Sequence, residues 1–175
     1  MRRDQVSDAI IKILLYIAPM YLANSTAMLF GGKKPLDLNK KFFDGKPILG
    51  KGKTFRGTAI GVLIGSATAL AVSVLFEQQT LLLSENYLAL GVLLSAGAIA
   101  GDIIASFFKR RNSIPQGTQV LFLDQLDFVF GGMIAGSIYY VPDFFEIIVI
   151  SVLTLIIHKL SNFFAFKAKL KNVPW

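Results

Sequence analysis

The sequence of 175 residues contains no cysteine and a single histidine, His158. The lack of cysteine excludes disulfides and thiolate metal sites, and a single histidine excludes a histidine-rich metal site. Charged residues are also scarce, at 17% of the chain against about 25% in a usual soluble domain, whereas 54% of the residues are hydrophobic. This composition excludes an ordinary soluble domain and indicates an integral membrane protein.

Several apolar stretches approach the roughly 20 residues that a helix needs to cross a bilayer. We predict an all-α integral membrane protein, a bundle of about five transmembrane helices that forms a single domain over residues 1–175. The predicted spans are 7–30, 58–76, 87–108, 121–141 and 145–166. The first run lacks a small-residue cleavage site, so we expect a retained span and not a signal peptide.

The loop between the first two predicted spans is strongly basic. Between Gly31 and Gly57 it carries eight lysine and arginine residues against Asp37 and Asp44, while the loop after the second span has two glutamates and no basic residue. By the positive-inside rule, the basic loop is cytoplasmic. We therefore expect a multi-pass protein of the cell membrane with its N-terminus outside and its C-terminus and polar site on the cytoplasmic side.

Small residues recur at a spacing of four within the predicted spans. Such rows let helix backbones approach closely, either within one bundle or at a homodimer face. The rows are Gly57, Gly61 and Gly65; Gly97 and Gly101; and Gly132 and Gly136.

Three aspartates lie near the predicted cytoplasmic ends of their spans. In the segment LFLDQLDFVFGG, Asp124 and Asp127 are three residues apart and share one helix face, and Asp102, Ser106 and Lys109 make a similar face on the preceding span. An ionised carboxylate at membrane depth is costly and usually faces a partner or a wet cavity. The three acids therefore mark a candidate site.

The aspartates allow two interpretations. Neighbouring carboxylates repel one another unless a divalent cation holds them, and an all-oxygen ligand set suits a hard metal such as Mg²⁺. Alternatively, the aspartates form structural ion pairs with Lys53, Lys109 or Arg110, or cap the fourth predicted helix. The residues alone leave both interpretations open.

The segment DGKPILGKGKTFRG of the basic loop combines glycines, which let a backbone approach a ligand, with side chains that suit phosphate groups. It lacks the spacing of a P-loop. A polybasic patch on anionic lipid headgroups is the alternative. Together with the aspartates, the segment indicates a nucleoside triphosphate bound beside a lipid headgroup, because such transfers depend on positioning and charge neutralisation.

Two further polar residues lie in predicted spans. Asn24 lies near the cytoplasmic end of the first span and either binds substrate or contacts a neighbouring helix. We interpret His158 as a packed or interfacial residue, since a phosphate acceptor is already anionic near neutral pH and needs no histidine base.

Three segments resemble a known family. In order and spacing, DGKPILGKGKTFRG, GDIIASFFKRR and LDQLDF are similar to motifs of the archaeal CDP-archaeol synthases, which are CTP-dependent cytidylyltransferases of the CdsA-type superfamily. The signature S-x-x-K-R followed by D-R-x-D is matched by Ser106, Lys109 and Arg110 and by Asp124 and Asp127. Gln125 replaces the arginine, and the Lys-Asp and His-Gly-Gly elements are missing, which favours the archaeal branch over a bacterial phosphatidate enzyme.

The resemblance implies transfer of CMP from CTP to the ether lipid phosphate 2,3-bis-O-geranylgeranylglycerol 1-phosphate, with Mg²⁺ as cofactor and pyrophosphate as second product. The expected partners are CTP, this isoprenoid lipid phosphate and the bilayer, with no nucleic acid and no obligatory protein. Two rival functions remain: a CTP-dependent lipid-alcohol kinase and a small membrane transporter.

These arguments yield a set of expected site residues. We expect Asp124, Asp127 and Lys109 to be catalytic, and Asp102, Asp124 and Asp127 to hold Mg²⁺. The expected substrate-binding residues are Asn24, Asp44, Lys46, Lys51, Lys53, Thr54, Arg56, Gly57, Ser106 and Arg110.

Overall fold

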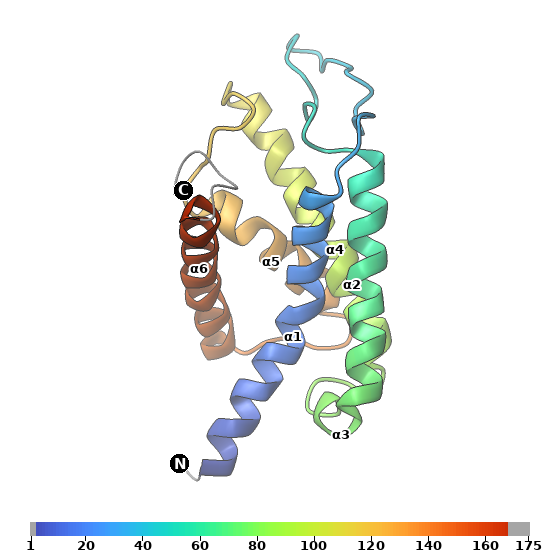
Figure 1. Ribbon diagram of the computed structural model, residues 1–175, viewed down its shortest axis with the longest axis vertical. Coiled ribbons are helices and arrows are strands. Elements are labelled where there is room, and N and C mark those ends of the chain that lie inside the picture. Colours follow the sequence, from blue (N-terminus) through green and yellow to red (C-terminus); the bar gives the residue numbers. More distant parts are fainter. Residues whose placement is uncertain (1–2, 168–175) are drawn as a thin grey trace.

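The computed structural model describes residues 3–167, and the regular elements of that part of the chain are six helices (Figure 1). The predicted all-α class is confirmed. The helices are α1 (Arg3–Leu29), α2 (Phe55–Leu75), α3 (Glu77–Thr80), α4 (Tyr87–Arg111), α5 (Leu123–Gly136) and α6 (Phe144–Lys167).

Three helices within the described residues are long and apolar enough to cross a membrane: α1 from Val6 onward, α2 and α4. The predicted total of about five spans is not confirmed. Helix α6 has 24 residues and agrees in extent with the predicted span 145–166. Helix α5 has 14 residues and rises only about 21 Å, against a hydrocarbon thickness of about 30 Å.

The predicted span 121–141 is therefore wrong as one continuous helix. Phe122 has a φ of 66°, a left-handed conformation that no helix interior accepts, and the helix begins at the next residue. At the other end the chain turns after Gly136, whose carbonyl accepts hydrogen bonds from the amides of Tyr139 and Tyr140. The whole run is apolar, but only part of it is helical, so its composition did not show where the helix begins and ends.

The glycine row of α2 packs directly against α1. A Cβ added at Gly61 would lie 2.7 Å from the carbonyl oxygen of Ala23, and one at Gly65 would lie 2.8 Å from that of Pro19. Side chains at these positions would force the helices apart, so the row serves packing inside the bundle.

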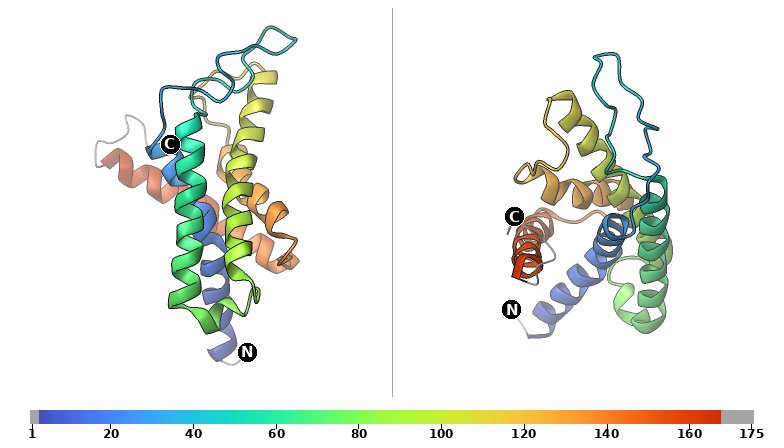
Figure 2. Two further views of the ribbon diagram at one scale, coloured as in Figure 1. Left: turned by 90° about the vertical axis from the view of Figure 1, so that its right-hand side faces the viewer. Right: turned by 45° about the horizontal axis from the view of Figure 1, so that its top comes forward.

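Helices α4 and α5 make an equally close contact and lie side by side in both views of Figure 2. A Cβ at Gly97 would meet the Gly131 carbonyl oxygen at 2.4 Å, and one at Gly101 would meet the Asp127 carbonyl oxygen at 2.2 Å. The acidic turn of α5 is thereby held beside Asp102, the residue that follows Gly101.

A proline interrupts the hydrogen bonding of α1. Pro19 lies inside the helix and has no N–H to donate to the carbonyl of Leu15, four residues earlier. The hydroxyl of Tyr87, the first residue of α4, donates to this carbonyl at 2.6 Å and satisfies it. The bond therefore joins α1 to the start of α4 inside the core, which also contains Tyr16, Met20, Leu90 and Leu94.

Helix α6 is attached to the bundle by a polar contact at its first turn. Lys12 of α1 forms an ion pair with Glu146 at 2.7 Å, and the hydroxyl of Tyr140 donates to the same carboxylate at 2.5 Å. The start of α1 lies at one end of the molecule together with α3, and the loop that joins α1 to α2 lies at the other end with the last turns of α4 (Figure 1). The loops that carry the candidate residues thus share one end of the bundle.

The close α4–α5 contact predicts that valine destabilises the fold much more at position 101 than at position 100. Gly101→Val places side-chain atoms against the Asp127 backbone and should destabilise the fold by about 1–3 kcal/mol or more. Ala100→Val, at an exposed position one residue earlier, should have little effect. Thermal unfolding in detergent measures both, and equal melting temperatures for the two variants would contradict this packing.

Candidate active site

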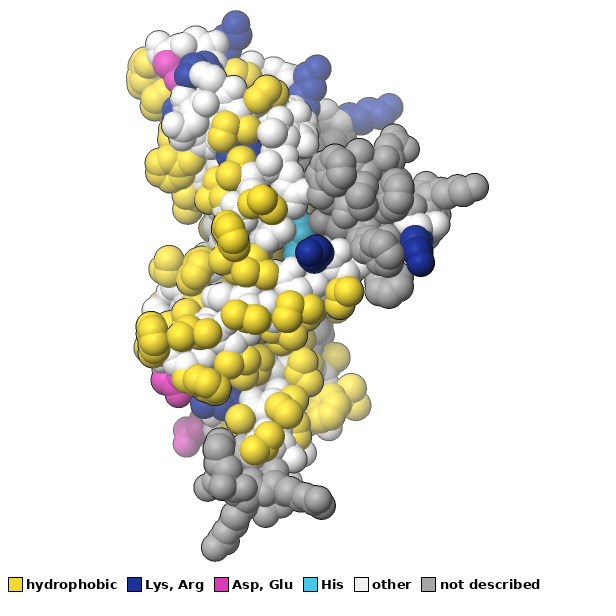
Figure 3. Space-filling view, turned by 90° about the vertical axis from the view of Figure 1, so that its left-hand side faces the viewer, with side chains coloured by type: hydrophobic (Ala, Val, Ile, Leu, Met, Phe, Trp, Pro, Cys, Tyr) yellow, Lys and Arg dark blue, Asp and Glu magenta, His cyan; other side chains and the backbone are white. Residues whose placement is uncertain are grey.

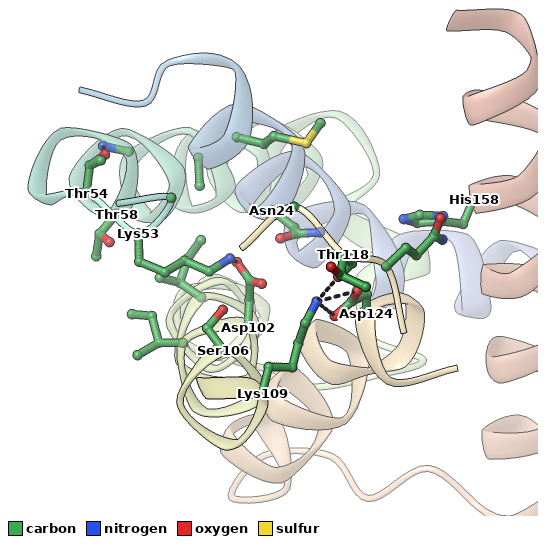
Figure 4. Close-up of a pocket in the computed structure, with 18 residues that line it drawn as sticks. Asn24, Lys53, Thr54, Thr58, Asp102, Ser106, Lys109, Thr118, Asp124 and His158 are labelled. Carbon is green, nitrogen blue, oxygen red and sulfur yellow. Dashed lines mark hydrogen bonds and ion pairs between the residues drawn. The ribbon is translucent and has the colours of Figure 1, made fainter. Parts of the chain in front are cut away.

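A cavity of about 540 Å³ lies at the loop end of the bundle (Figure 4). Its wall combines the end of α1, the end of the α1–α2 loop, the start of α2, the last turns of α4, the α4–α5 connection and the first turn of α5, with one residue from α6. Eight expected site residues line it: Asn24, Lys53, Thr54, Gly57, Asp102, Ser106, Lys109 and Asp124.

Two lysine–aspartate pairs dominate the cavity. The Lys109 amine lies 2.7 Å from both carboxylate oxygens of Asp124 and also donates to the Thr118 carbonyl at 2.7 Å. Lys53 pairs with Asp102 and thereby joins the basic loop to α4. Asp102 and Asp124 thus form the ion pairs that the second interpretation predicts.

The three expected metal ligands do not form one cluster. Among the residues that the structure describes, no group of three His, Cys, Asp or Glu side chains is placed to hold a metal ion. Asp127 is outside the cavity wall, and its carboxylate accepts a hydrogen bond of 2.6 Å from the amide of Phe128. The α5 backbone at Asp127 is pressed against Gly101, which sets the position of this side chain by packing.

The remaining acids still fit a magnesium ion. Asp102 and Asp124 face the same cavity, and Mg²⁺ is usually held by one or two carboxylates together with substrate phosphates. A set of two carboxylates therefore meets the requirement, and three protein carboxylates are not needed.

The hydroxyl of Thr54 has a structural role. It is the N-cap of α2 and accepts hydrogen bonds from the amides of Gly57 at 3.1 Å and Gly32 at 3.0 Å. Its side chain is 5% exposed. Thr54 therefore fixes the junction of loop and helix that brings Lys53 to the cavity.

Several expected substrate-binding residues lie outside the cavity wall. Asp44 pairs with Arg111 at 2.5 Å, and the Lys46 amine donates to the Arg111 carbonyl at 2.7 Å. Both bonds dock the loop on the C-terminal end of α4, where unpaired carbonyls favour cations. The others are Lys51, whose amide donates to Gln116; the exposed Arg56; and Arg110, which lines a separate cavity of about 330 Å³.

Asp37 organises the basic loop, although the sequence analysis assigned it no role. The buried Asp37 carboxylate accepts hydrogen bonds from the amides of Asn39, Leu49 and Gly50 at 3.0, 2.9 and 2.8 Å. Burial alone would raise the pKa of Asp37, but these bonds outweigh it and hold the pKa below its usual 3.8. A single carboxylate thus closes the loop on itself.

Sequence reasoning also missed parts of the cavity wall. Gly117, Thr118 and Gln119 of the α4–α5 connection line it, as does Thr58 one turn after Thr54. His158, interpreted as a packed or interfacial residue, reaches the wall from α6 (Figure 4). For the α4–α5 connection, a glycine followed by polar residues was a sequence pattern that could have indicated a binding loop. No sequence pattern could have placed His158 in the wall, because its position depends on how α6 packs.

The fold and the cavity define an integral membrane protein with a charged, partly open site at the ends of its helices. The family model described as CarS-like, CDP-archaeol synthase, matches residues 6–175. The chain is 39% identical over 168 residues to the CDP-archaeol synthase of Methanocaldococcus jannaschii, covering 93% of this chain and 95% of that protein. For the CDP-archaeol synthase of Pyrococcus abyssi, the identity is 40% over 171 residues, with 96% and 99% covered.

A solved structure supports the same grouping. An intramembrane enzyme for archaeal membrane lipid biosynthesis superposes with a TM-score of 0.78 at 29% identity, covering 85% of this chain and 91% of the other. The chain belongs to the CDP-archaeol synthase family.

The composition of the cavity wall predicts which basic residue of the loop contributes most to catalysis. Lys53→Met removes a cation that faces the cavity, and we expect kcat/KM to fall by about 100-fold or more, as for other charge-stabilising groups. Arg56→Met removes an exposed cation outside the wall and should cost less than tenfold, roughly the range of a weak contact. Steady-state assays of both variants measure the difference, and a larger loss for Arg56→Met would refute this geometry.

Asp37 predicts how the loop responds to acid. Because its folded pKa lies below the unfolded value, the carboxylate stabilises the loop above about pH 4, and this contribution is lost as the pH falls through the folded pKa. Asp37→Asn should remove it at neutral pH as well. Hydrogen exchange at the amides of Leu49 and Gly50 should accelerate in the variant while the amides of α4 keep their protection; unchanged exchange at both would contradict the assignment.

Proposed function

We propose that this protein transfers CMP from CTP to the phosphate of 2,3-bis-O-geranylgeranylglycerol 1-phosphate and releases pyrophosphate. The observation that carries the proposal is the pair of lysine–aspartate contacts in one cavity of a chain that belongs to the CDP-archaeol synthase family. Nucleotidyl transfer requires cations for the triphosphate and carboxylates for a metal, and both line this cavity.

The proposed reaction forms one bond and breaks one. An oxygen of the lipid phosphate attacks the α-phosphorus of CTP, a new P–O–P linkage forms, and the bond between the α- and β-phosphates breaks. The electron pair of the broken bond leaves with pyrophosphate. The attacking oxygen is already anionic near neutral pH, so no side chain has to remove a proton from it.

The two lysines supply most of the charge neutralisation in this proposal. Lys53 and Lys109 are paired with Asp102 and Asp124 in the absence of substrate, and each amine has phosphate oxygens as an alternative partner when CTP is bound. Asn24 and Ser106 line the same wall and supply neutral hydrogen-bonding groups. Asp102 and Asp124 would hold Mg²⁺, which neutralises the triphosphate and the pyrophosphate leaving group.

The cavity also offers an apolar wall for the lipid end of the acceptor. Ala27, Met28, Ile99 and Ile103 line it beside the charged pairs. We propose that the isoprenoid chains remain among the helices and only the phosphate enters the polar part. With the basic loop on the cytoplasmic side, CTP reaches the cavity from the cytoplasm.

The decisive experiment follows the released product. Purified protein in lipid, given CTP, Mg²⁺ and the ether lipid phosphate, should release pyrophosphate. Asp124→Asn should lower this release by about 100-fold or more, because the carboxylate lines the cavity, pairs with Lys109 and would hold Mg²⁺ in the proposed reaction. Asp8→Asn, the same substitution at an exposed position of α1, serves as the matched control and should keep full activity.

The products separate the rival functions. Release of CDP in place of pyrophosphate, with a lipid alcohol as acceptor, would show a kinase. A folded protein that leaves CTP intact with every lipid phosphate tested would rule out the proposed reaction.

A further inference from the structure

The tip of the loop between α1 and α2, residues 38–43, exposes large apolar side chains, which are unusual in a loop on the cytoplasmic side. Phe43 is 100% exposed and Leu38 is 48% exposed, and Lys40 and Lys41 lie between them. Contiguous exposed apolar side chains in a soluble loop mark a contact surface. The question is what this loop tip contacts.

An aromatic row connects the loop tip to α4. The ring of Phe43 lies 5.0 Å from that of Phe42, Phe42 lies 5.4 Å from Phe107, and Phe107 lies 5.8 Å from Phe108, all in edge-to-face contacts. The guanidinium of Arg111 stacks 4.8 Å from the Phe42 ring. The height of the loop tip along the bundle is therefore fixed by the last turn of α4.

That height coincides with the edge of the hydrocarbon layer. The exposed large apolar side chains of α4 begin at Leu88 and end at Phe108, 20 residues apart, which is a rise of about 30 Å. This equals the usual hydrocarbon thickness of about 30 Å. In Figure 3, hydrophobic side chains are spread along the visible flank of the bundle, with several lysine and arginine side chains at its upper end. Phe42 and Phe43 then lie at the level of the lipid headgroups.

The charges agree with this placement. Arg111 stacks on Phe42 and Phe107, and the exposed Lys40 and Lys41 directly precede Phe42 in the chain. The exposed Asp44, beside the loop tip, is paired with Arg111. Aromatic rings with lysine and arginine are the usual anchors at a membrane interface, and basic residues there are attracted to anionic lipids. We propose that residues 38–43 are a membrane-surface anchor that inserts Phe43 into the headgroup region of the same leaflet and binds anionic lipid through Lys40 and Lys41.

The anchor gives the basic loop a second attachment. On the side toward the bundle, Asp44 and Lys46 hold the loop to the end of α4, and on the other side the loop tip rests on the bilayer. The stretch that carries Lys53 is thereby kept over the cavity. This inference does not depend on the proposed reaction, because it concerns contact with lipid alone.

The test uses tryptophan fluorescence in the full chain reconstituted in vesicles. Trp175, the single tryptophan, is replaced by phenylalanine, and Phe43→Trp is introduced at the fully exposed position. With lipids brominated near the headgroup, the emission of this variant should be quenched as strongly as that of Phe108→Trp, the reference at the hydrocarbon edge. Quenching no stronger than that of free N-acetyl-tryptophanamide would overturn the anchor and leave contact with a protein partner as the alternative.

A second variant tests the charge component. Adding Lys40→Ser and Lys41→Ser to the Phe43→Trp protein should lower the equilibrium constant for insertion in phosphatidylglycerol vesicles by roughly fivefold for each lysine. In phosphatidylcholine vesicles, the two proteins should be quenched alike. Equal quenching of both proteins in phosphatidylglycerol at all salt concentrations would overturn the lipid-charge contact. Helical content and the melting temperature serve as the check of folding, because none of the three positions lies in a helix.

Discussion

The arrangement of the site depends on direct contact between helix backbones. At Gly97 and Gly101 of α4, the carbonyl oxygens of α5 come closer than any side chain would allow, and Gly61 and Gly65 admit α1 to α2 in the same way. In a bilayer, helices gain little from apolar association, so such packing is a main source of stability. Because the glycine contact with α5 immediately precedes Asp102, the packing also sets the distance between the carboxylates of the two helices.

The charges of the side chains that line the cavity nearly balance one another. Each of its two lysines is matched by an aspartate, so the protein does not bury an isolated cation or anion at the edge of the membrane. In the proposed reaction, phosphates and metal would exchange partners with side chains that these pairs already hold in place, which would limit the entropy lost on binding.

The sequence predicted the class of fold, close helix packing at the α2 glycine row and eight residues of the cavity wall, because apolar runs and motif spacing report local structure. It left open whether that row packs within the bundle or at a homodimer face. It overestimated α5, since composition cannot reveal the left-handed Phe122 that starts this helix late. It also expected Asp44 and Lys46 to bind substrate, and it could not predict that both contact Arg111 at the C-terminal end of α4. The loop contacts of Asp37 and the place of His158 in the cavity wall were not predicted for a related reason: both depend on contacts with distant residues, and no local pattern encodes these.

The bond between Tyr87 and Leu15 bears on how the protein is made. Its two ends are 72 residues apart, and synthesis proceeds at roughly 5–20 residues per second, so α1 enters the membrane seconds before Tyr87 leaves the ribosome. During that interval, the Leu15 carbonyl beside Pro19 lacks its final donor, and an unpaired carbonyl in lipid is costly. The first helix therefore completes its hydrogen bonding only after α4 has inserted, which couples the final shape of α1 to the arrival of a later part of the chain.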